Sequence, residues 1–325
     1  MVVCMCAALR LGETGNDAGD AATALVAWGN AWLTGHVGPD EAVDAVEKLA
    51  GPQILSGGAA IMSTGPELPG TAGLPGGLSG LGGLGGLGGP EHDGPGGDTP
   101  DGDAGGSPSE RGRQGQPGEV TLRRGLGDLR VGGLIGLLLA LPAPGDPLGL
   151  TGPPAFNRRA LDAGAAVIAV LPGRAVGLVP SEDRRGSSYV GVRWESHEAV
   201  LGTPDVPALP DADRQLMLAM RDATEVLLTV DDVAGVPPEI TDALADLRDP
   251  DRGDHPLAPG YPQRAHRVAA LAQRLSLVVD LARRMDDRGL TADQMRRRAE
   301  ALRLLDRAVR RARVAACNSA FDPVP

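Results

Sequence analysis

The stretch VGGLIGLLLALPAPGDPLGLTGPPAFN, residues 131–157, decides the fold expected for this chain. Its first half, from Val131 to Leu141, is apolar but shorter than the ~20 residues that a membrane-spanning helix needs, so it predicts a buried strand. The second half, from Leu141 to Asn157, contains five prolines and three glycines and predicts a stiff loop. A short helix over Pro154–Ala163 should follow, ending at Gly164 as its C-terminal cap.

The segments on either side of this stretch alternate with a period of two and predict further strands. Val120 and Leu122 precede the apolar run. The strands expected after it are Ala165–Leu171, Ala175–Val179 and Tyr189–Trp194. Pro172-Gly173, between two apolar runs, is typical of a hairpin turn. Residues of about 119–202 are therefore expected to form a small mixed β-sheet.

The C-terminal third predicts helices over about residues 209–315. Leu216, Met220 and Ala223 share one helical face, and the segments at 237–249 and 263–285 repeat this pattern. The last helix should begin at a capping box formed by Thr291 and Gln294. The apolar stripe of that helix comprises Met295, Ala299, Leu302, Leu305, Val309 and Ala312. Together these helices predict an antiparallel bundle.

Two helices are also expected near the N-terminus, one carrying Trp28 and Trp32 and a second that begins at Pro39 and ends at Gly51. The Gly- and Pro-rich segment that follows is low in β-branched and aromatic residues and is typical of a disordered linker. The fold class expected is α+β. The domains expected are an N-terminal helical hairpin (1–62), a disordered linker (63–118) and an α+β domain (119–325).

Composition excludes several functions. Lys48 is the only lysine and has no glycine-rich loop before it, which excludes a P-loop or a kinase-type phosphate site. Cys4, Cys6 and Cys317 form no CxxC pair, which argues against a disulfide framework or a zinc finger and favours the cytoplasm. The N-terminal segment lacks the features of a signal peptide, and no membrane association is expected. We also expect no cofactor and no metal.

Five residues are the candidates for a ligand-binding site: Asp146, Asn157, Arg158, Glu195 and His197. The prolines of the 141–157 loop remove backbone donors, so only side chains there could bind a ligand. Glu195 and His197, near the end of a strand in WESHE, should point to one face, as an acid–base pair would. The alternative is structural: Asp146 and Asn157 hydrogen-bond local backbone, and the WESHE segment is a solvated strand end.

The last helix is strongly basic, with eight arginines between residues 296 and 313. The net charge of the whole chain is −11, so we do not expect nucleic-acid binding. Instead, the acidic residues around Asp211–Asp254 offer partners for these arginines, within the chain or across a dimer.

The run PAPGDPLGLTGPPAFNRRALDAG, followed by strands and an arginine-rich helical end, resembles an uncharacterised family of actinobacterial proteins over about residues 120–315. The resemblance implies no activity and no catalytic residue.

Two functions remain as hypotheses. The first is a non-enzymatic cytoplasmic interaction or regulatory protein that binds a protein partner, or forms a homo-oligomer, through its C-terminal helices. The second is a small-molecule-binding protein or enzyme whose pocket lies between the 141–157 loop and the 194–198 strand end.

Overall fold

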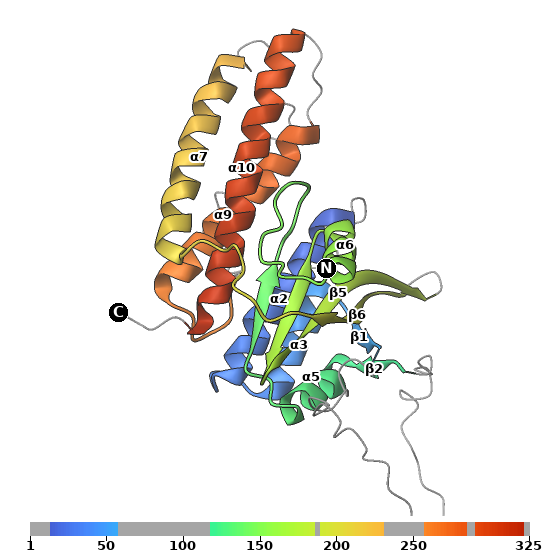
Figure 1. Ribbon diagram of the computed structural model, residues 1–325. Helices are drawn as coiled ribbons and strands as arrows, with labels where there is room; N and C mark the ends of the chain where they lie inside the picture. Colours follow the sequence, from blue (N-terminus) through green and yellow to red (C-terminus); the bar gives the residue numbers. More distant parts are fainter. Residues whose placement is uncertain (1–13, 58–117, 186–188, 231–256, 285–289, 322–325) are drawn as a thin grey trace, which may run out of the picture. The chain divides into compact units, whose positions relative to one another are not determined.

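The chain folds as an α+β protein in which a six-stranded mixed sheet has helices on both faces and three long helices near one edge (Figure 1). The computed structural model describes residues 14–57, 118–185, 189–230, 257–284 and 290–321. All of them belong to one compact unit. The α+β class expected from the sequence is confirmed.

The strands follow the order β2-β1-β6-β5-β4-β3. β1 runs parallel to β6, and every other neighbouring pair is antiparallel. The predicted turn at Pro172-Gly173 is confirmed: Leu171 pairs with Arg174, and Gly173 has a φ of +72°, which glycine adopts without strain. The strands are β1 (Gln53–Ser56), β2 (Val120–Thr121), β3 (Gly136–Ala140), β4 (Ala166–Leu171), β5 (Arg174–Arg185) and β6 (Tyr189–Ala199).

The two faces of the sheet carry separate apolar cores. α2 (Thr14–Leu33) packs on β3, β4 and β5, and its Leu25 is fully buried in the larger core. α3 (Pro39–Ala50) packs against α2. α6 (Pro154–Ala163) covers the opposite face and buries Phe156 against β5, where Gly177 leaves room for the ring. A Cβ atom at residue 177 would lie 2.3 Å from that ring.

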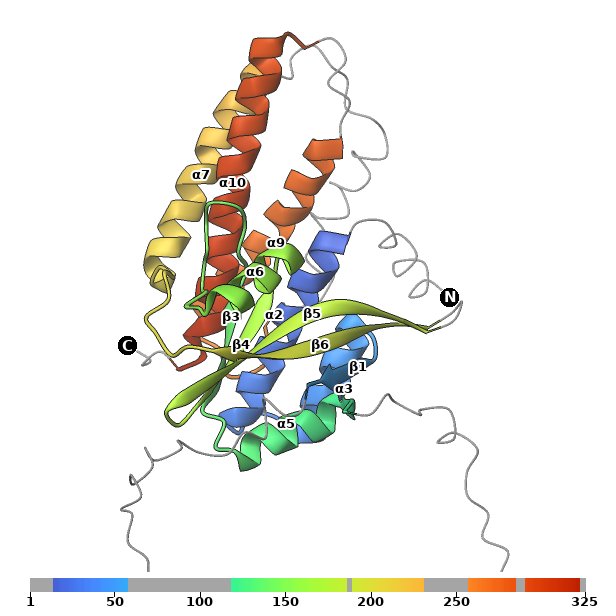
Figure 2. The ribbon, with the colours of Figure 1, turned by 45° about the vertical axis from the view of Figure 1, so that its right-hand side comes forward.

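The C-terminal helices are arranged around α10 (Ala292–Asn318), which packs along both α7 (Leu209–Val230) and α9 (Gln263–Arg284), as Figure 2 shows. The capping box at the start of α10 is confirmed: Thr291 Oγ1 accepts from Gln294 N, and Thr291 N donates to Gln294 Oε1 at 2.9 Å. Within the expected stripe, Met295 and Ala299 are exposed, and burial begins at Leu302. The predicted helix at 237–249 lies outside the described residues.

The outer edge of β3 is closed by side chains rather than by another strand. Asn30 on α2 donates to Leu137 O at 2.8 Å and accepts from Leu137 N at 2.9 Å. Asn318 at the end of α10 does the same for Leu139, at 3.1 and 2.7 Å. Each carboxamide therefore satisfies the donor and the acceptor that an edge residue would otherwise leave unpaired.

Two of the predicted strands are longer than the observed ones. The prediction of strands at Val120–Leu122 and Val131–Leu141 is wrong in part, because Leu122 and Val131 are the two ends of a helix. α5 (Leu122–Val131) buries Leu122, Leu126 and Leu129, and β3 begins only at Gly136. The Thr121 hydroxyl caps this helix by accepting from Arg124 N. The glycines within α5 disfavour a helix. Gly125 nevertheless lets α5 pack closely on β1, since a Cβ there would lie 2.6 Å from Leu55 Cδ2 and would force that side chain to shift.

β1 was not expected from the sequence. It pairs in parallel with residues 192–195 of β6, and its Gln53 Oε1 accepts a 2.6 Å hydrogen bond from the indole nitrogen of buried Trp194. A strand of four residues has little periodicity of its own, so its partner elsewhere in the chain determines it. In the described part of the chain, no helix is long and apolar enough to cross a bilayer.

Replacing Asn30 should destabilise the fold more than replacing a less buried asparagine. Asn30→Ala should lower the free energy of unfolding by about 2–5 kcal/mol, because it leaves the N–H and C=O of Leu137 without partners. Asn157→Ala, which loses one hydrogen bond at a half-buried position, should cost about 1 kcal/mol. Urea unfolding measures both, and equal losses would contradict the role given to Asn30.

Candidate functional sites

Glu195 and His197 lie on the face of the sheet that α6 covers. Alternation along β6 turns both side chains to this face, opposite the side on which Trp194 is buried. His197 Nε2 lies 3.7 Å from Glu195 Oε2, and the two face β5 at Gly177 and Val179. The shared face expected from the sequence is therefore observed.

Arg159 on α6 engages the Glu195 carboxylate. Its Nη2 atom is 2.7 Å from Glu195 Oε2, and this hydrogen bond, together with the charge of Glu195, raises the pKa of Arg159 above its ordinary value. His197 lies beside Phe156, with ring centroids 6.3 Å apart. Its Nε2 atom is buried and has no hydrogen-bond partner among the described residues. Glu195 is thus held by an arginine, and the imidazole makes no hydrogen bond to it.

Asn157 and Arg158 have different environments. Asn157 Oδ1 accepts a hydrogen bond from Gly152 N at 3.0 Å, which ties the first turn of α6 to the loop before it. This hydrogen bond is the local backbone contact expected for Asn157 if it has a structural role and does not bind a ligand. Arg158 is exposed and forms no ion pair with any residue in the described ranges.

Asp146 lies elsewhere, against α10. It is 4% exposed, and its carboxylate faces three guanidinium groups: Arg311 Nη1 at 3.1 Å, Arg310 Nη2 at 3.3 Å and Arg307 Nε at 3.4 Å. Arg310 also donates to Leu141 O at 2.9 Å. The structural alternative, in which Asp146 hydrogen-bonds local backbone, is wrong for this side chain, because its carboxylate binds arginines of α10 and fixes the 141–157 loop there.

The structure does not bring the five candidates together. Asn157, Glu195 and His197 are on or beside the α6 face, Arg158 points to solvent and Asp146 contacts α10. The 141–157 loop and the 200–204 segment, together with β3 and β4, line a cavity of about 20 Å³, room for one water molecule, and none of the five candidates lines it.

Arginines in the C-terminal half of α10 pair with carboxylates that the sequence did not indicate. Arg313 pairs with Asp20 on α2 at 2.7 Å, and Arg311 pairs with Asp205 at 3.0 Å as well as with Asp146. Asp211 and Asp213 instead pair with Arg214 and Arg264. Pairing of the α10 arginines within the chain with carboxylates around Asp211–Asp254 is therefore wrong for the residues of that range that the structure describes; residues 231–256 lie outside it.

A second ionic cluster was also missed. Glu119 contacts both Arg185 and Arg193, and Asp183 contacts the same two arginines, with both carboxylates almost fully buried. This ionic cluster joins the start of β2 to the β5–β6 hairpin. No residue spacing in the sequence indicates it. Elsewhere in the described ranges, no three His, Cys, Asp or Glu side chains are grouped as metal ligands would be.

Comparison with known proteins divides the matched part of the chain between two family models. A family model for the N-terminal domain of Rv1486c-like proteins matches residues 22–91 and 98–210, and a model for their C-terminal domain matches residues 210–314. The chain belongs to the Rv1486c-like family. The boundary between the two models falls at the start of α7.

The relatives are mycobacterial proteins named as uncharacterised. Rv1486c of Mycobacterium tuberculosis is 28% identical over 324 residues, covering 91% of this chain and 95% of the relative. ML1804 of Mycobacterium leprae is 28% identical over 327 residues with the same coverage. No solved structure is significantly similar to the chain. The expected membership of an uncharacterised actinobacterial family is confirmed.

Removing the charge of Asp146 should be far more costly than removing that of Asp205. Asp146→Asn should lower the free energy of unfolding by about 3 kcal/mol, because three arginines lose their buried counter-charge. Asp205→Asn should cost at most about 1 kcal/mol, since this carboxylate is largely exposed. Chemical unfolding of the two variants checks this, and similar losses would contradict the structural role of Asp146.

Cys317 should be unreactive while the protein is folded. The thiol is buried, and loss of hydration raises its pKa to about 12, so almost no thiolate exists at pH 8. In a variant with Cys4 and Cys6 replaced by serine, iodoacetamide should label Cys317 in urea but not in native buffer. Fast labelling of the native protein would contradict this burial.

Proposed function

We propose that this chain is a non-enzymatic cytoplasmic interaction protein that forms a homodimer through the outer side of α7. The observation that carries the proposal is a stripe of exposed residues on that helix. Leu218 is 60% exposed and Leu228 is 72% exposed, with Arg221 and Glu225 between them. These four residues are called the α7 outer stripe.

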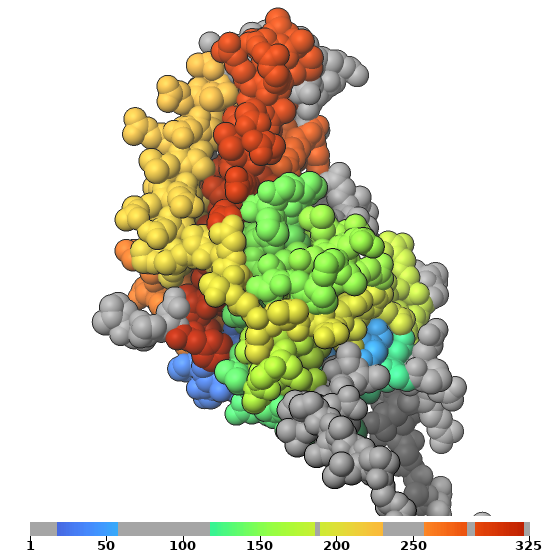
Figure 3. All heavy atoms as spheres, in the orientation of Figure 1, coloured from blue at the N-terminus to red at the C-terminus, as the bar shows by residue number. Residues whose placement is uncertain are grey.

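The α7 outer stripe faces away from the rest of the described chain. At 100° per residue the four positions fall within about 80° of one another around the helix. Leu216 and Ala223 occupy the opposite side and are buried. The spacing of 3, 4 and 3 residues is that of a coiled-coil seam, in which one helix packs along another. Figure 3 shows α7 in yellow at the surface beside α10.

A second copy of the chain is the partner that this stripe fits. Arg221 and Glu225 form no ion pair within the described residues. Leu218 lies three residues before Arg221, and Leu228 lies three residues after Glu225. An antiparallel pair of α7 helices that places Arg221 opposite Glu225 of the other copy therefore also places Leu218 opposite Leu228. The stripe is self-complementary, as a two-fold interface requires.

Leu218→Glu or Leu228→Glu should dissociate the dimer. Each change occurs twice per dimer, and each buried leucine contributes roughly 1.5–3 kcal/mol, so the dimer dissociation constant should rise by about 100-fold or more. Sedimentation velocity of the full chain at micromolar concentration measures this. Leu49→Glu, at a similarly exposed leucine on α3, is the control and should leave the dimer intact. A wild-type protein that is monomeric under these conditions would overturn the proposal.

A charge exchange tests the antiparallel register. Arg221→Glu and Glu225→Arg should each weaken the dimer, because like charges then face each other twice. The double variant should dimerise again, and a mixture of the two single variants should form a heterodimer. Dimers that persist in both leucine variants, or single charge variants that the double exchange fails to rescue, would contradict this arrangement.

A further inference from the structure

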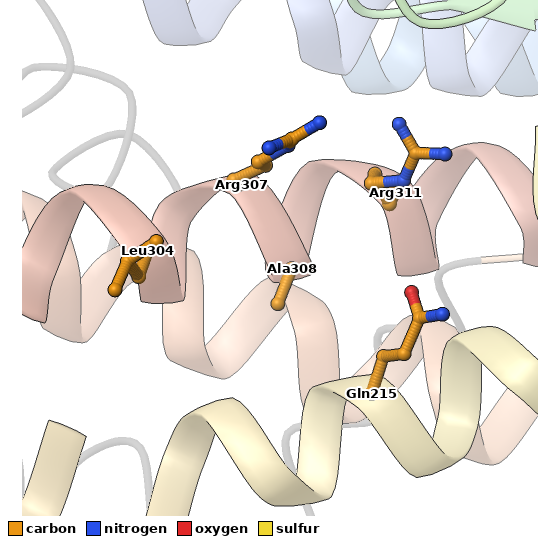
Figure 4. Close-up of a pocket in the computed structure, with 5 residues that line it drawn as sticks. All are labelled: Gln215, Leu304, Arg307, Ala308 and Arg311. Atoms are coloured by element: carbon orange, nitrogen blue, oxygen red, sulfur yellow. The ribbon is translucent and has the colours of Figure 1, made fainter. Parts of the chain in front are cut away.

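An open cavity of about 320 Å³ lies between α7 and α10, outside the α7 outer stripe (Figure 4). Its volume is at the lower end of the range found for small-molecule sites. Gln215 comes from α7, and the other lining residues come from one side of α10: Leu304, Arg307, Ala308 and Arg311. In Figure 4 the Gln215 amide points toward Arg311.

Of the two cationic groups that line the cavity, Arg307 is the one with the less complete charge compensation. Arg307, Arg310 and Arg311 share the buried carboxylate of Asp146, but Arg310 also pairs with Asp306 at 3.3 Å and Arg311 with Asp205 at 3.0 Å, so of the three Arg307 has no second carboxylate among the described residues. Arg307 is 48% exposed, its contact with Asp146 runs through Nε, and its guanidinium donates no hydrogen bond to a described residue. Its terminal nitrogens therefore retain donors for an anion.

Asp205 already shows how a carboxylate binds here. Its two oxygens accept from Arg311 Nη2 at 3.0 Å and Nη1 at 3.3 Å, the two-pronged geometry that arginine forms with carboxylates. The hydrogen bond from Arg311 lowers the pKa of Asp205 below its ordinary value. Asp205 is 67% exposed and lies in the irregular segment between β6 and α7, so its displacement by another carboxylate costs little.

The same cavity also offers apolar surface. Leu304 and Ala308 line it one turn apart on α10, and Leu304 is half exposed. An inorganic anion would leave this surface in water, whereas an organic acid with a short hydrocarbon chain would cover it.

We propose that the α7–α10 cavity binds small organic carboxylates, with the carboxylate on Arg307 and Arg311 and the hydrocarbon part on Leu304 and Ala308. Asp205 occupies Arg311 in the free protein and is displaced by the ligand. Gln215 supplies a further hydrogen bond from α7. The proposal is independent of dimer formation, because the α7 outer stripe contributes none of the lining residues.

Isothermal titration calorimetry of the full chain with octanoate tests the site, with 1-octanol and inorganic phosphate as the two comparison probes. Octanoate should bind. 1-Octanol lacks the carboxylate and phosphate lacks the hydrocarbon chain, so each should bind at least about tenfold more weakly. Arg307→Gln should weaken octanoate binding about tenfold or more, as expected for the loss of a charge-assisted contact. Arg303→Gln, one turn away and paired with Glu300, is the matched control and should bind like the wild type.

Asp205→Asn tests whether the ligand displaces the Asp205 carboxylate from Arg311 or binds without affecting it. Without the competing charge, octanoate should bind about two- to fivefold more tightly, the range that corresponds to an exposed ion pair. The proposal is supported if Asp205→Asn binds octanoate more tightly than the wild type and Arg307→Gln binds it more weakly. Absence of octanoate binding, equal binding of octanol or phosphate, or unchanged affinity in both variants would overturn it.

Discussion

The closure of the β3 edge by side-chain amides is the interaction on which the rest of the structure depends. Asn30 and Asn318 come from helices at opposite ends of the chain, yet they bind Leu137 and Leu139, two residues apart on one strand. Arg310 extends the series to the carbonyl oxygen of Leu141. Because β3 is the last strand of the sheet, these contacts replace the neighbour that an open edge would otherwise recruit.

The same contacts set the position of the helices. Tyr261, at the start of α9, donates to Cys317 O at 3.0 Å and lies within 3.5 Å of the Asn30 amide nitrogen. A buried network with every group satisfied favours one arrangement, because any shift along the helix axes would leave polar atoms unpaired. α2 and α10 are thus held to the sheet by hydrogen bonds of fixed geometry as well as by apolar packing, and Tyr261 joins the segment before α9 to both of these helices.

Local signals in the sequence predicted the parts of the fold that local chemistry determines. Pro39, Gly51, Gly164 and the Thr291–Gln294 box mark helix ends through backbone geometry that a few neighbouring residues specify. α5 was missed because its glycines disfavour a helix, and the contact of Gly125 with Leu55 of β1 is not revealed by the sequence. β1 was missed because its pairing with β6 is formed with residues far along the chain.

The candidate site residues also fall into two groups: those whose contacts follow from neighbouring sequence and those whose contacts depend on distant parts of the chain. The common face of Glu195 and His197 follows from strand alternation, and the bond of Asn157 to Gly152 follows from its place at a helix start. The role of Asp146 could not be predicted, because its three arginines lie more than 160 residues later and are spaced along a helix like many solvated arginines. Its proline-rich surroundings suggested a loop, and only the packing of that loop on α10 shows the ion pairs.

The parallel pairing of β1 with β6 has a consequence for the order of folding. Ser56 donates to Trp194 O across 138 residues of chain, so β1 has no partner within the sheet interior until β6 has been synthesised. At roughly 5–20 residues per second, the wait on the ribosome is about 7–28 s. Loop-closure entropy grows only with the logarithm of loop length, so the intervening segment adds little to the equilibrium cost. The delay is therefore kinetic, and the N-terminal helices complete their core only after the strands that follow them in the chain.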